Sequence, residues 1–188
     1  MSNNKSFHKL ITDAKIAVSG KSGCGNTTVC RLLADTLNLR FINFTFRTLA
    51  KEKGLSLEEV LALAAKDDSW DREVDKRQIE LAREEGGCVL GSRLAIWMLP
   101  DADLKIVLTA RPEIRAQRIR DREGGELGKT AEFTAERDRQ DHERYARIYK
   151  IDNDDYSFAD AIIDTENKNP EEIVKQITNE LNKKLSSL

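Results

Sequence analysis

Nine consecutive residues, Gly20 to Thr28, combine residue types and spacing that suit the binding of a phosphate chain; they read GKSGCGNTT. An apolar run over residues 14–19 precedes them, and apolar residues at helical spacing follow them. Three glycines in such a loop allow the backbone to wrap around an anion, with consecutive N–H groups pointing inward. The N-terminus of the following helix adds positive potential. We therefore predict that this segment cradles the phosphates of a nucleotide.

The segment follows the P-loop motif at every defined position except one. Thr27 fills the position whose hydroxyl binds Mg²⁺, and Asn26 stands where the motif has a lysine that reaches the β and γ phosphates. A charge-assisted hydrogen bond contributes about 1.5–3 kcal/mol against roughly 1 kcal/mol for a neutral one, so this exchange is expected to weaken phosphate binding or catalysis. The predicted ATP-binding residues of the loop are Gly20, Lys21, Ser22, Gly23, Cys24, Gly25, Asn26, Thr27 and Thr28.

The missing positive charge has a candidate replacement in Lys21, five residues before Asn26 on the same loop. Some P-loop ATPases carry a signature lysine at this second position. We therefore take Lys21 as a candidate catalytic residue. In the alternative, Lys21 points into solvent and arginines from mobile segments supply the charge.

Short apolar runs alternate with helical patterns along the whole chain, which predicts a parallel sheet with helices on both faces. Ligands of such folds bind at the carboxyl ends of the strands. The expected fold is therefore an α/β three-layer P-loop sandwich with a five-stranded parallel sheet. The strand candidates are residues 14–19, 39–42, 88–90, 104–108 and 159–163.

Two helical regions, residues 43–85 and 111–150, are longer than simple crossovers require. We expect parts of them to form mobile flaps: a monophosphate-binding insert at about 43–85 and a lid at about 122–144. Residues 1–13 are polar and predict a loose arm. Asn169, Pro170 and the apolar residues after them predict a last helix with a well-defined start. The chain, residues 1–188, is expected to form one domain.

Composition excludes several classes of protein. The 188 residues carry a formal net charge of −2, so no overall positive field favours nucleic acid. No apolar run is long enough to span a bilayer. Three cysteines without CxxC spacing argue against disulfides and zinc. We expect a cytoplasmic, monomeric protein with small-molecule ligands, no nucleic-acid partner and no membrane partner.

Several segments together resemble the cytidylate kinases, chiefly the archaeal-type branch of the P-loop nucleoside monophosphate kinases. The resemblance runs from about Lys15 to Leu181. It implies transfer of the γ-phosphoryl group of ATP to CMP, and also to dCMP, with Mg²⁺ as cofactor. The segments that carry it, after the P-loop, read TTVCRLLADTLNL, FRTLAKEKGLSLEEV, WDREVDKRQIELA, SRLAIWML, RAQRIRDREG and ERYARIYKIDNDDYS.

The resemblance also implies roles for individual side chains. Arg47 and Arg93 match arginines that hold the acceptor phosphate. Arg137 and Arg144 match catalytic arginines that contact phosphates, and Asp141 between them matches a residue that holds the acceptor ribose. Asp71 and Arg72 lie where the family reads the base, and Arg118 is placed near the donor adenine or phosphates.

The chain departs from the family again at Gly91 and Ser92, where an acidic residue and a glycine are common before the arginine matched by Arg93. Two departures at the phosphate end leave open a catalytically weak nucleotide sensor on a kinase fold. Another small P-loop kinase with a different acceptor is a second alternative.

Other polar and aromatic residues of these segments are expected to have no part in binding. The arginines predicted to lie on a solvated helix face are Arg115, Arg120 and Arg122, and the aromatic residues predicted to serve packing are Trp70, Trp97, Tyr145 and Tyr149.

Overall fold

The computed structural model describes residues 11–187. Most of the predicted loose arm, residues 1–10, therefore lies outside the described residues. Residues 11–13 are helical, and Ile11 packs against the main core. The prediction of a loose arm was wrong for these three residues, because the apolar side chain of Ile11 finds a surface to bury against.

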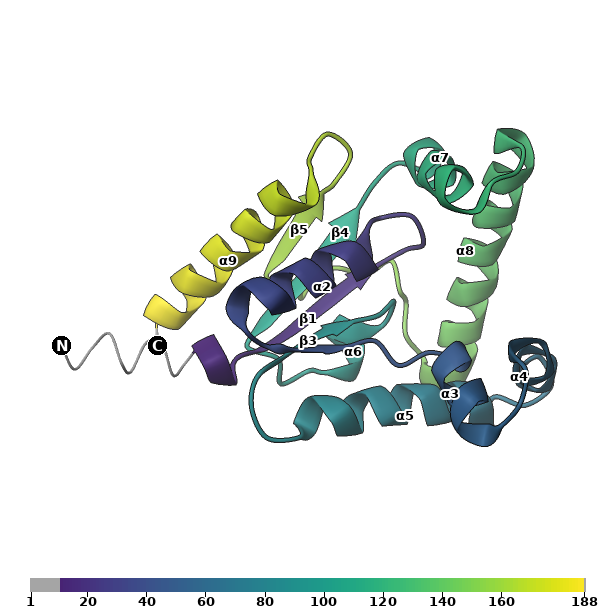
Figure 1. Cartoon of the computed structure of the whole chain (residues 1–188), viewed down its shortest axis with the longest axis horizontal. Helices are drawn as coiled ribbons and strands as arrows, with labels where there is room; N and C mark the ends of the chain where they lie inside the picture. The colour runs from purple at the N-terminus through teal and green to yellow at the C-terminus, as the bar shows by residue number, and fades with distance from the viewer. Residues whose placement is uncertain (1–10, 188) are drawn as a thin grey trace.

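Five parallel strands form a single sheet in the order β2-β3-β1-β4-β5. Each strand begins within two residues of a predicted one, and the α/β three-layer fold is confirmed. β1 lies at the centre, so the loop that follows it emerges at the middle of the carboxyl edge (Figure 1). The strands are β1 (Lys15–Gly20), β2 (Arg40–Ile42), β3 (Cys88–Gly91), β4 (Leu104–Thr109) and β5 (Ala161–Asp164).

Two helices cover each face of the sheet. α2 (Asn26–Leu37) and α9 (Pro170–Ser186) lie on one face, and α5 (Ser69–Arg83) and α6 (Ala95–Met98) lie on the other. The four-residue helix α6 was missed from the sequence, because one turn is too short to show helical periodicity. Its backbone is anchored to the sheet by the Ile96 N–H, which donates to the Ser19 hydroxyl at 3.1 Å.

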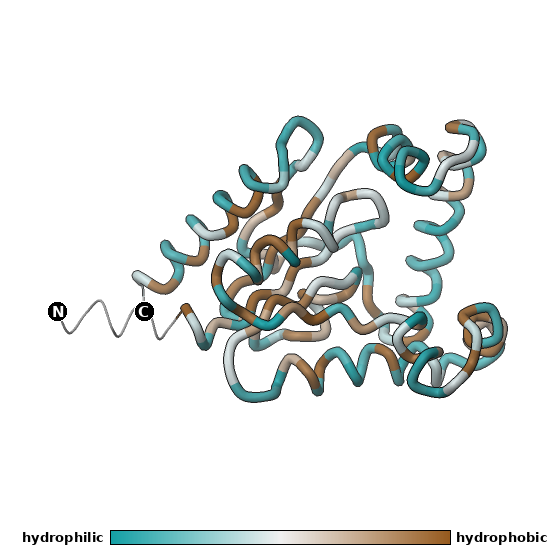
Figure 2. Tube along the Cα trace, viewed as in Figure 1, coloured by the Kyte–Doolittle hydropathy of each residue, from teal (hydrophilic) through white to brown (hydrophobic). Residues whose placement is uncertain are grey.

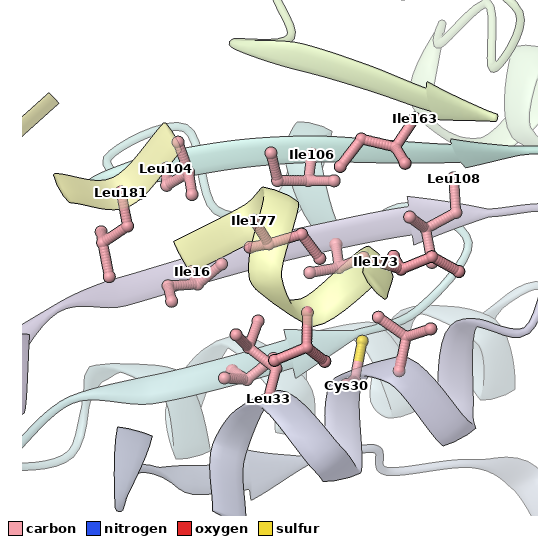
Figure 3. Close-up of a cluster of buried hydrophobic side chains, with 14 of the residues drawn as sticks. Ile16, Cys30, Leu33, Leu104, Ile106, Leu108, Ile163, Ile173, Ile177 and Leu181 are labelled. Carbon is pink, nitrogen blue, oxygen red and sulfur yellow. The ribbon is translucent and has the colours of Figure 1, made fainter. Parts of the chain in front are cut away.

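The main core lies between the sheet and the pair α2 and α9 (Figure 3). Ile16, Leu33 and Ile177 are fully buried there, and the cluster extends along the apolar stripe of α9. That helix starts as predicted. The Asn169 side chain accepts a hydrogen bond from the Glu172 N–H, and the Glu172 side chain accepts one from the Asn169 N–H. Pro170 occupies the first turn. The sheet is thereby fixed as a rigid platform for the loops at its carboxyl edge.

The remaining helices stand beyond the carboxyl ends of the strands (Figure 1). α3 (Phe46–Lys53) and α4 (Leu57–Ala64) come from the predicted insert, while α7 (Pro112–Glu123) and α8 (Leu127–Tyr149) contain the predicted lid. α8 runs from α7 to the neighbourhood of α3 and is mostly hydrophilic (Figure 2). The movement of these segments stays a prediction. Within residues 11–187, no helix combines the length and apolar character needed to cross a bilayer.

Truncation of Ile177 should show how much the fold depends on this core. Ile177 is fully buried, so Ile177→Ala is expected to lower the free energy of unfolding by about 2–5 kcal/mol through lost burial and the cavity left behind. Ile162 on the edge strand β5 is 56% exposed, so Ile162→Ala should cost less than about 1 kcal/mol. Urea unfolding of both variants measures this, and equal losses would contradict the assignment of the core.

Candidate active site

A cavity of about 400 Å³ opens at the carboxyl edge of the sheet, where the fold class predicts the ligand site. Its volume lies within the range of about 300–1,000 Å³ typical of small-molecule sites. The cavity is walled by the P-loop, the segment before α3, one face of α5, the end of β3 and α8. Its lining residues outside the P-loop are Asn43, Phe44, Thr45, Phe46, Asp71, Val74, Asp75, Gln78, Gly91, Ser92, Arg93, Leu94, Arg122, Arg137, Arg144 and Tyr145.

The P-loop has the backbone geometry that anion binding requires. Gly23 and Gly25 have φ values of +86° and +88°, a region that side chains with a Cβ rarely adopt. Gly25 caps α2 without any side-chain hydrogen bond, so the first N–H groups of α2 are left open to an external anion. Thr27 and Thr28 are exposed and line the cavity, and their contacts with phosphate and metal stay predictions.

Cys24 departs from the predicted set. Its side chain is only 2% exposed, belongs to the main core and does not line the cavity. Burial raises the pKa of its thiol, so it stays protonated and uncharged. Its backbone N–H donates to the Lys21 carbonyl at 3.1 Å and closes a turn in the loop. Cys24 therefore shapes the loop, and its side chain offers nothing to a nucleotide.

Arg115 corrects the prediction of a solvated helix face. Its side chain is only 6% exposed and lies behind the P-loop, where it donates to the Ser22 carbonyl at 3.1 Å and pairs with Asp138 of α8 at 2.6 Å. A Cβ added to Gly23 would stand 2.6 Å from the Arg115 carbonyl oxygen, so the loop rests directly on α7. A buried guanidinium requires such partners. Ser22 and Asp138 are far from Arg115 in the sequence, so the sequence pattern does not predict these contacts.

Arg118 is also occupied by the protein itself. It donates to the carbonyls of Gly23 and Thr165 and to the Thr165 hydroxyl, at 3.3, 2.6 and 2.9 Å. It does not line the cavity. A contact between Arg118 and the donor nucleotide stays a prediction, and its observed role is to tie the P-loop to the segment after β5.

The two departures from the family pattern meet in space. The Asn26 amide donates to the Val18 carbonyl of β1 at 2.9 Å, and its carbonyl oxygen accepts from the Cys30 thiol at 3.1 Å. A Cβ on Gly91 would stand 2.9 Å from that Asn26 oxygen and 2.8 Å from the Cys30 sulfur. An acidic side chain at position 91 therefore has no room beside Asn26 and Cys30 as they stand. The asparagine spans the base of the loop and does not extend along it.

Lys21, the candidate substitute, lines the cavity from the P-loop. Its Nζ lies 2.6 Å from the Asp154 carboxylate, on the segment that follows α8. Its side chain is 28% exposed and Asp154 is 50% exposed, so the pair is half open to water. A half-exposed ion pair is weak, which leaves Lys21 able to exchange Asp154 for a phosphate.

The predicted arginines on α8 and in the turn after β3 come together around a buried carboxylate. Asp141 receives Arg93 at 2.8 Å and Arg144 at 2.8 Å, and its side chain is only 6% exposed. Arg93 also donates to the Ser22 hydroxyl at 2.7 Å, and Arg144 lies 3.2 Å from Asp71. The carboxylates neutralise part of the charge and aim both guanidinium groups at the cavity. Because Asp141 is occupied in this way, its predicted contact with the ribose stays a prediction.

Arg137 is different, because its guanidinium forms no hydrogen bond or ion pair within residues 11–187. It lines the cavity close enough to Arg93 for the two charges to interact. Burial, followed by the charge of Arg93, lowers the pKa of Arg137 below its ordinary value. Arg93 shares the Asp141 carboxylate with Arg144, so the positive charge of Arg93 and Arg137 is only partly neutralised, and a phosphate dianion suits such a site.

Arg47 and Arg72 do not line the cavity. Arg47 is exposed in the first turn of α3, next to the lining residue Phe46. Arg72 is exposed on α5, donates to the Ile148 carbonyl at 3.3 Å and covers the Tyr149 ring. Contact of either arginine with the acceptor stays a prediction.

Sequence reasoning missed part of the α5 wall. Asp71, which was predicted, lines the cavity, and the residues that were missed are Asp75 and Gln78. The three follow one another at four and three residues, so they share one helix face with the apolar Val74. Polar residues in the buried stripe of a helix were the available signal. Arg122 and Tyr145 were also missed, since one was assigned to a solvated face and the other to packing; both line the cavity. Trp70 and Trp97 do pack against apolar clusters, as predicted.

The comparisons with known proteins show the family of this chain. The model of the cytidylate kinase-like family matches residues 15–167. The chain is 46% identical over 174 residues to cytidylate kinase 2 of Borreliella afzelii, which covers 90% of this chain and 97% of that protein. It is 44% identical over 158 residues to the cytidylate kinase of Pyrococcus horikoshii, which covers 83% of this chain and 82% of that protein. The chain belongs to the cytidylate kinase-like family.

Solved structures support the fold of this kinase. Shikimate kinase from Acinetobacter baumannii superposes with a TM-score of 0.63 at 17% identity, covering 94% of this chain and 97% of that one. Deoxyadenosine kinase from M. mycoides superposes with a TM-score of 0.52 at 14% identity, covering 89% and 99%. At such low identity these likenesses concern the P-loop kinase fold alone.

Kinases of this type use Mg²⁺ with ATP, and the P-loop of this chain fits that ion in part. Thr27 presents an exposed hydroxyl to the cavity at the position where the motif places a metal ligand. Gly91 supplies no carboxylate at the end of β3, and Asn26 is turned toward β1. Mg²⁺ commonly keeps several waters and phosphate oxygens as ligands, so one protein hydroxyl is compatible with its binding.

A side chain at position 91 should test the packing of Asn26. Gly91→Ala places a methyl group against Asn26 and Cys30 and is expected to lower the free energy of unfolding by about 1–3 kcal/mol. Combined with Cys30→Ala, the same change should cost clearly less, because space is made for it. Gly128→Ala on the exposed side of α8 is the control and should be neutral or stabilising. Urea unfolding of these three variants, of Cys30→Ala alone and of the native protein measures the costs, and equal costs of Gly91→Ala in both backgrounds would contradict the contact.

Asp75 should give the stability a measurable pH dependence. Burial raises the pKa of Asp75 to about 6, although the hydrogen bond from Tyr149 lowers it. The ordinary value is about 3.9, so the protonated form stabilises the fold below about pH 4, and this contribution disappears as pH rises through about 6. Asp75→Asn lacks this dependence. We compare the unfolding free energy of Asp75→Asn with that of the native protein at two pH values. The difference, variant minus native, should be about 1–3 kcal/mol larger at about pH 7.5 than at about pH 4. Urea unfolding at both pH values checks this; an equal difference at both contradicts it.

Proposed function

We propose that this protein transfers the γ-phosphoryl group of ATP to CMP, and also to dCMP, with ADP and CDP or dCDP as products. The observation that carries the proposal is the pair Arg93 and Arg137, whose charge is not fully neutralised, in the same cavity as the P-loop. The P-loop suits the phosphates of a donor, and the arginine pair suits the phosphate of an acceptor. Relatives that are 44–46% identical and named cytidylate kinase support CMP as the acceptor.

The donor binds through the P-loop in this proposal. The open N–H groups at the start of α2 and the helix dipole hold the β and γ phosphates of ATP. Thr27 would hold Mg²⁺, which neutralises phosphate charge when bound. Arg115 and Arg118 support the loop from behind, so its conformation is fixed before the nucleotide arrives.

The acceptor phosphate binds between Arg93, Arg137 and Arg144. Asp141 orients two of these arginines through buried ion pairs, so little reorganisation is needed when the substrate enters. One oxygen of the acceptor phosphate forms a bond to the γ phosphorus while the bond from that phosphorus to the β,γ-bridging oxygen breaks, and ADP leaves with the electron pair. The attacking oxygen is already anionic, so no strong base is required.

Catalysis then rests on position and charge. The arginines bring two mutually repelling anions into line and spread the charge that develops on the transferred group. We propose that the lid, residues 122–144, closes over the cavity and excludes water, which limits hydrolysis of ATP. Lys21 replaces the missing motif lysine by exchanging Asp154 for a phosphate oxygen.

A second function is favoured by one observation. The Asn26 amide is bound to the Val18 carbonyl, so the side chain at the motif position does not extend toward a phosphate. A nucleotide-binding sensor with very slow turnover is the function that this arrangement favours. The measurement of product separates it from a kinase.

The first test is product formation from ATP and Mg²⁺ with CMP, dCMP, UMP and AMP offered separately. We expect rapid formation of CDP and dCDP and less product from UMP and AMP. Binding of ATP and CMP by calorimetry, without any diphosphate product, would support the sensor. Selective conversion of a different acceptor would contradict the proposed specificity.

Removal of the Lys21 charge should lower turnover without harming the fold. Loss of a charge-assisted contact to a phosphate is expected to lower kcat about 10- to 150-fold in Lys21→Ala. Lys183→Ala removes a lysine of α9 whose side chain is 71% exposed and which lies outside the cavity and the lid, and it should leave kcat unchanged. Steady-state kinetics and a melting curve measure both variants. Unchanged turnover in Lys21→Ala would mean that arginines alone supply the charge.

The cytoplasmic location and the monomeric state stay predictions within this proposal. Both suit an enzyme whose substrates are small soluble nucleotides. Size-exclusion chromatography with light scattering measures the oligomeric state.

A further inference from the structure

One wall of the cavity has no part in holding phosphates. It is formed by α5, where Asp75 and Gln78 lie beside Val74. Val74 packs with Phe44 in one apolar cluster, and Phe46 packs against that cluster. Apolar surfaces with a few polar groups at one end are typical of sites that hold a flat heterocycle. This wall therefore suits the base of the acceptor nucleotide, and its polar groups decide which base is accepted.

Asp75 is the polar group with the most unusual surroundings. One carboxylate oxygen accepts from the Tyr149 hydroxyl at 2.6 Å, and the other lies 3.5 Å from the Gln78 amide, at the limit of a hydrogen bond. No lysine or arginine within residues 11–187 forms an ion pair with it, because Arg144 pairs with Asp71 and Asp141 instead. An ionised carboxylate accepts about four hydrogen bonds, so acceptor capacity is left over.

A purely structural link between α5 and α8 would not require this charge. An asparagine accepts from a tyrosine hydroxyl equally well and avoids the desolvation of a carboxylate. That desolvation is substantial, because burial is the main cause that raises the pKa of Asp75 to about 6. The groups that face Asp75 are Asp71 on its own helix and Tyr149 and Arg144 on α8. Above about pH 6 the charge is present and available to a ligand.

The pyrimidine bases differ at the position that such a group reads. Cytosine carries an exocyclic amino group, which donates hydrogen bonds, and an aspartate or glutamate accepts from it in known base recognition. Uracil carries a carbonyl oxygen at the same position, which a carboxylate repels. Gln78, which both donates and accepts, can pair with the neighbouring ring atoms of either base.

We propose that Asp75, oriented by Tyr149, accepts a hydrogen bond from the exocyclic amino group of cytosine and thereby makes the enzyme prefer CMP over UMP. The inference rests on the proposed CMP kinase activity and assigns specificity to a residue outside the phosphate site. Asp75 is a specificity-determining residue here and takes no part in phosphoryl transfer.

The test compares CMP with its analogue that lacks the amino group, a pyrimidin-2-one nucleotide, in the native enzyme and in Asp75→Ala. We expect the native kcat/KM to favour CMP about 10- to 150-fold, as for a charge-assisted hydrogen bond. In Asp75→Ala the two substrates should differ by less than about threefold. Glu80→Ala, an exposed carboxylate of α5 that lies outside the cavity, is the matched control and should keep the native ratio.

An unchanged ratio in Asp75→Ala would overturn the proposal. If both substrates lose activity equally, Asp75 is a structural link between α5 and α8, and if neither loses activity, it has no part in binding. If Asp75→Ala does not fold, the native enzyme decides by its pH profile. Its preference for CMP over the analogue should fall below about pH 6 as Asp75 is protonated, while titration of the acceptor phosphate affects both substrates alike. A preference that stays constant from about pH 5 to about pH 8 would also overturn it.

The failure of the parent proposal looks different. A native enzyme that forms no CDP contradicts the kinase activity itself. A native enzyme that forms CDP readily, with a ratio that Asp75→Ala does not change, contradicts only the role of Asp75.

Discussion

The buried carboxylate of Asp141 is the interaction on which the site depends. It holds Arg93 from the turn after β3 and Arg144 from its own helix, and Arg93 reaches on to Ser22 of the P-loop. A charge so poorly exposed is tolerated only because both partners are present. The sheet, the P-loop and α8 are thereby joined through one polar network. The position of α8 over the cavity is therefore coupled to the arrangement of the phosphate-binding groups.

Arginines play two separate parts around this network. Arg115 and Arg118 lie behind the P-loop, with their donors spent on the protein's own carbonyl and carboxylate oxygens. Arg93 and Arg137 face the cavity, where their charge is only partly matched. The first pair holds the loop in its shape, and the second pair creates the attraction for substrate. Residue type alone does not separate these roles; the number of internal partners does.

The uncharged residue at the lysine position is part of a local repacking. Asn26, Cys30 and Gly91 fill one volume between α2 and β3, and each limits the size of the others. An acidic residue at the strand end therefore has no room beside Asn26 and Cys30 as they stand. The P-loop backbone keeps its anion-binding shape, since that shape depends on Gly23 and Gly25 and on support from α7.

The sequence by itself determined the strands, the P-loop, the main helices and the start of α9, because each is encoded by local periodicity, glycine placement or capping residues. Through the resemblance to a family it also predicted Arg93, Arg137, Asp141 and Arg144 as site residues, and the structure brings these four side chains together. Only the tertiary structure decided that Arg115 is buried, that Cys24 faces the core and that Asp75 meets Tyr149. These outcomes depend on contacts between segments far apart in the chain. At these contacts the packing of distant segments sets the burial, the charge state and the partners of each side chain. A local sequence pattern does not predict that packing.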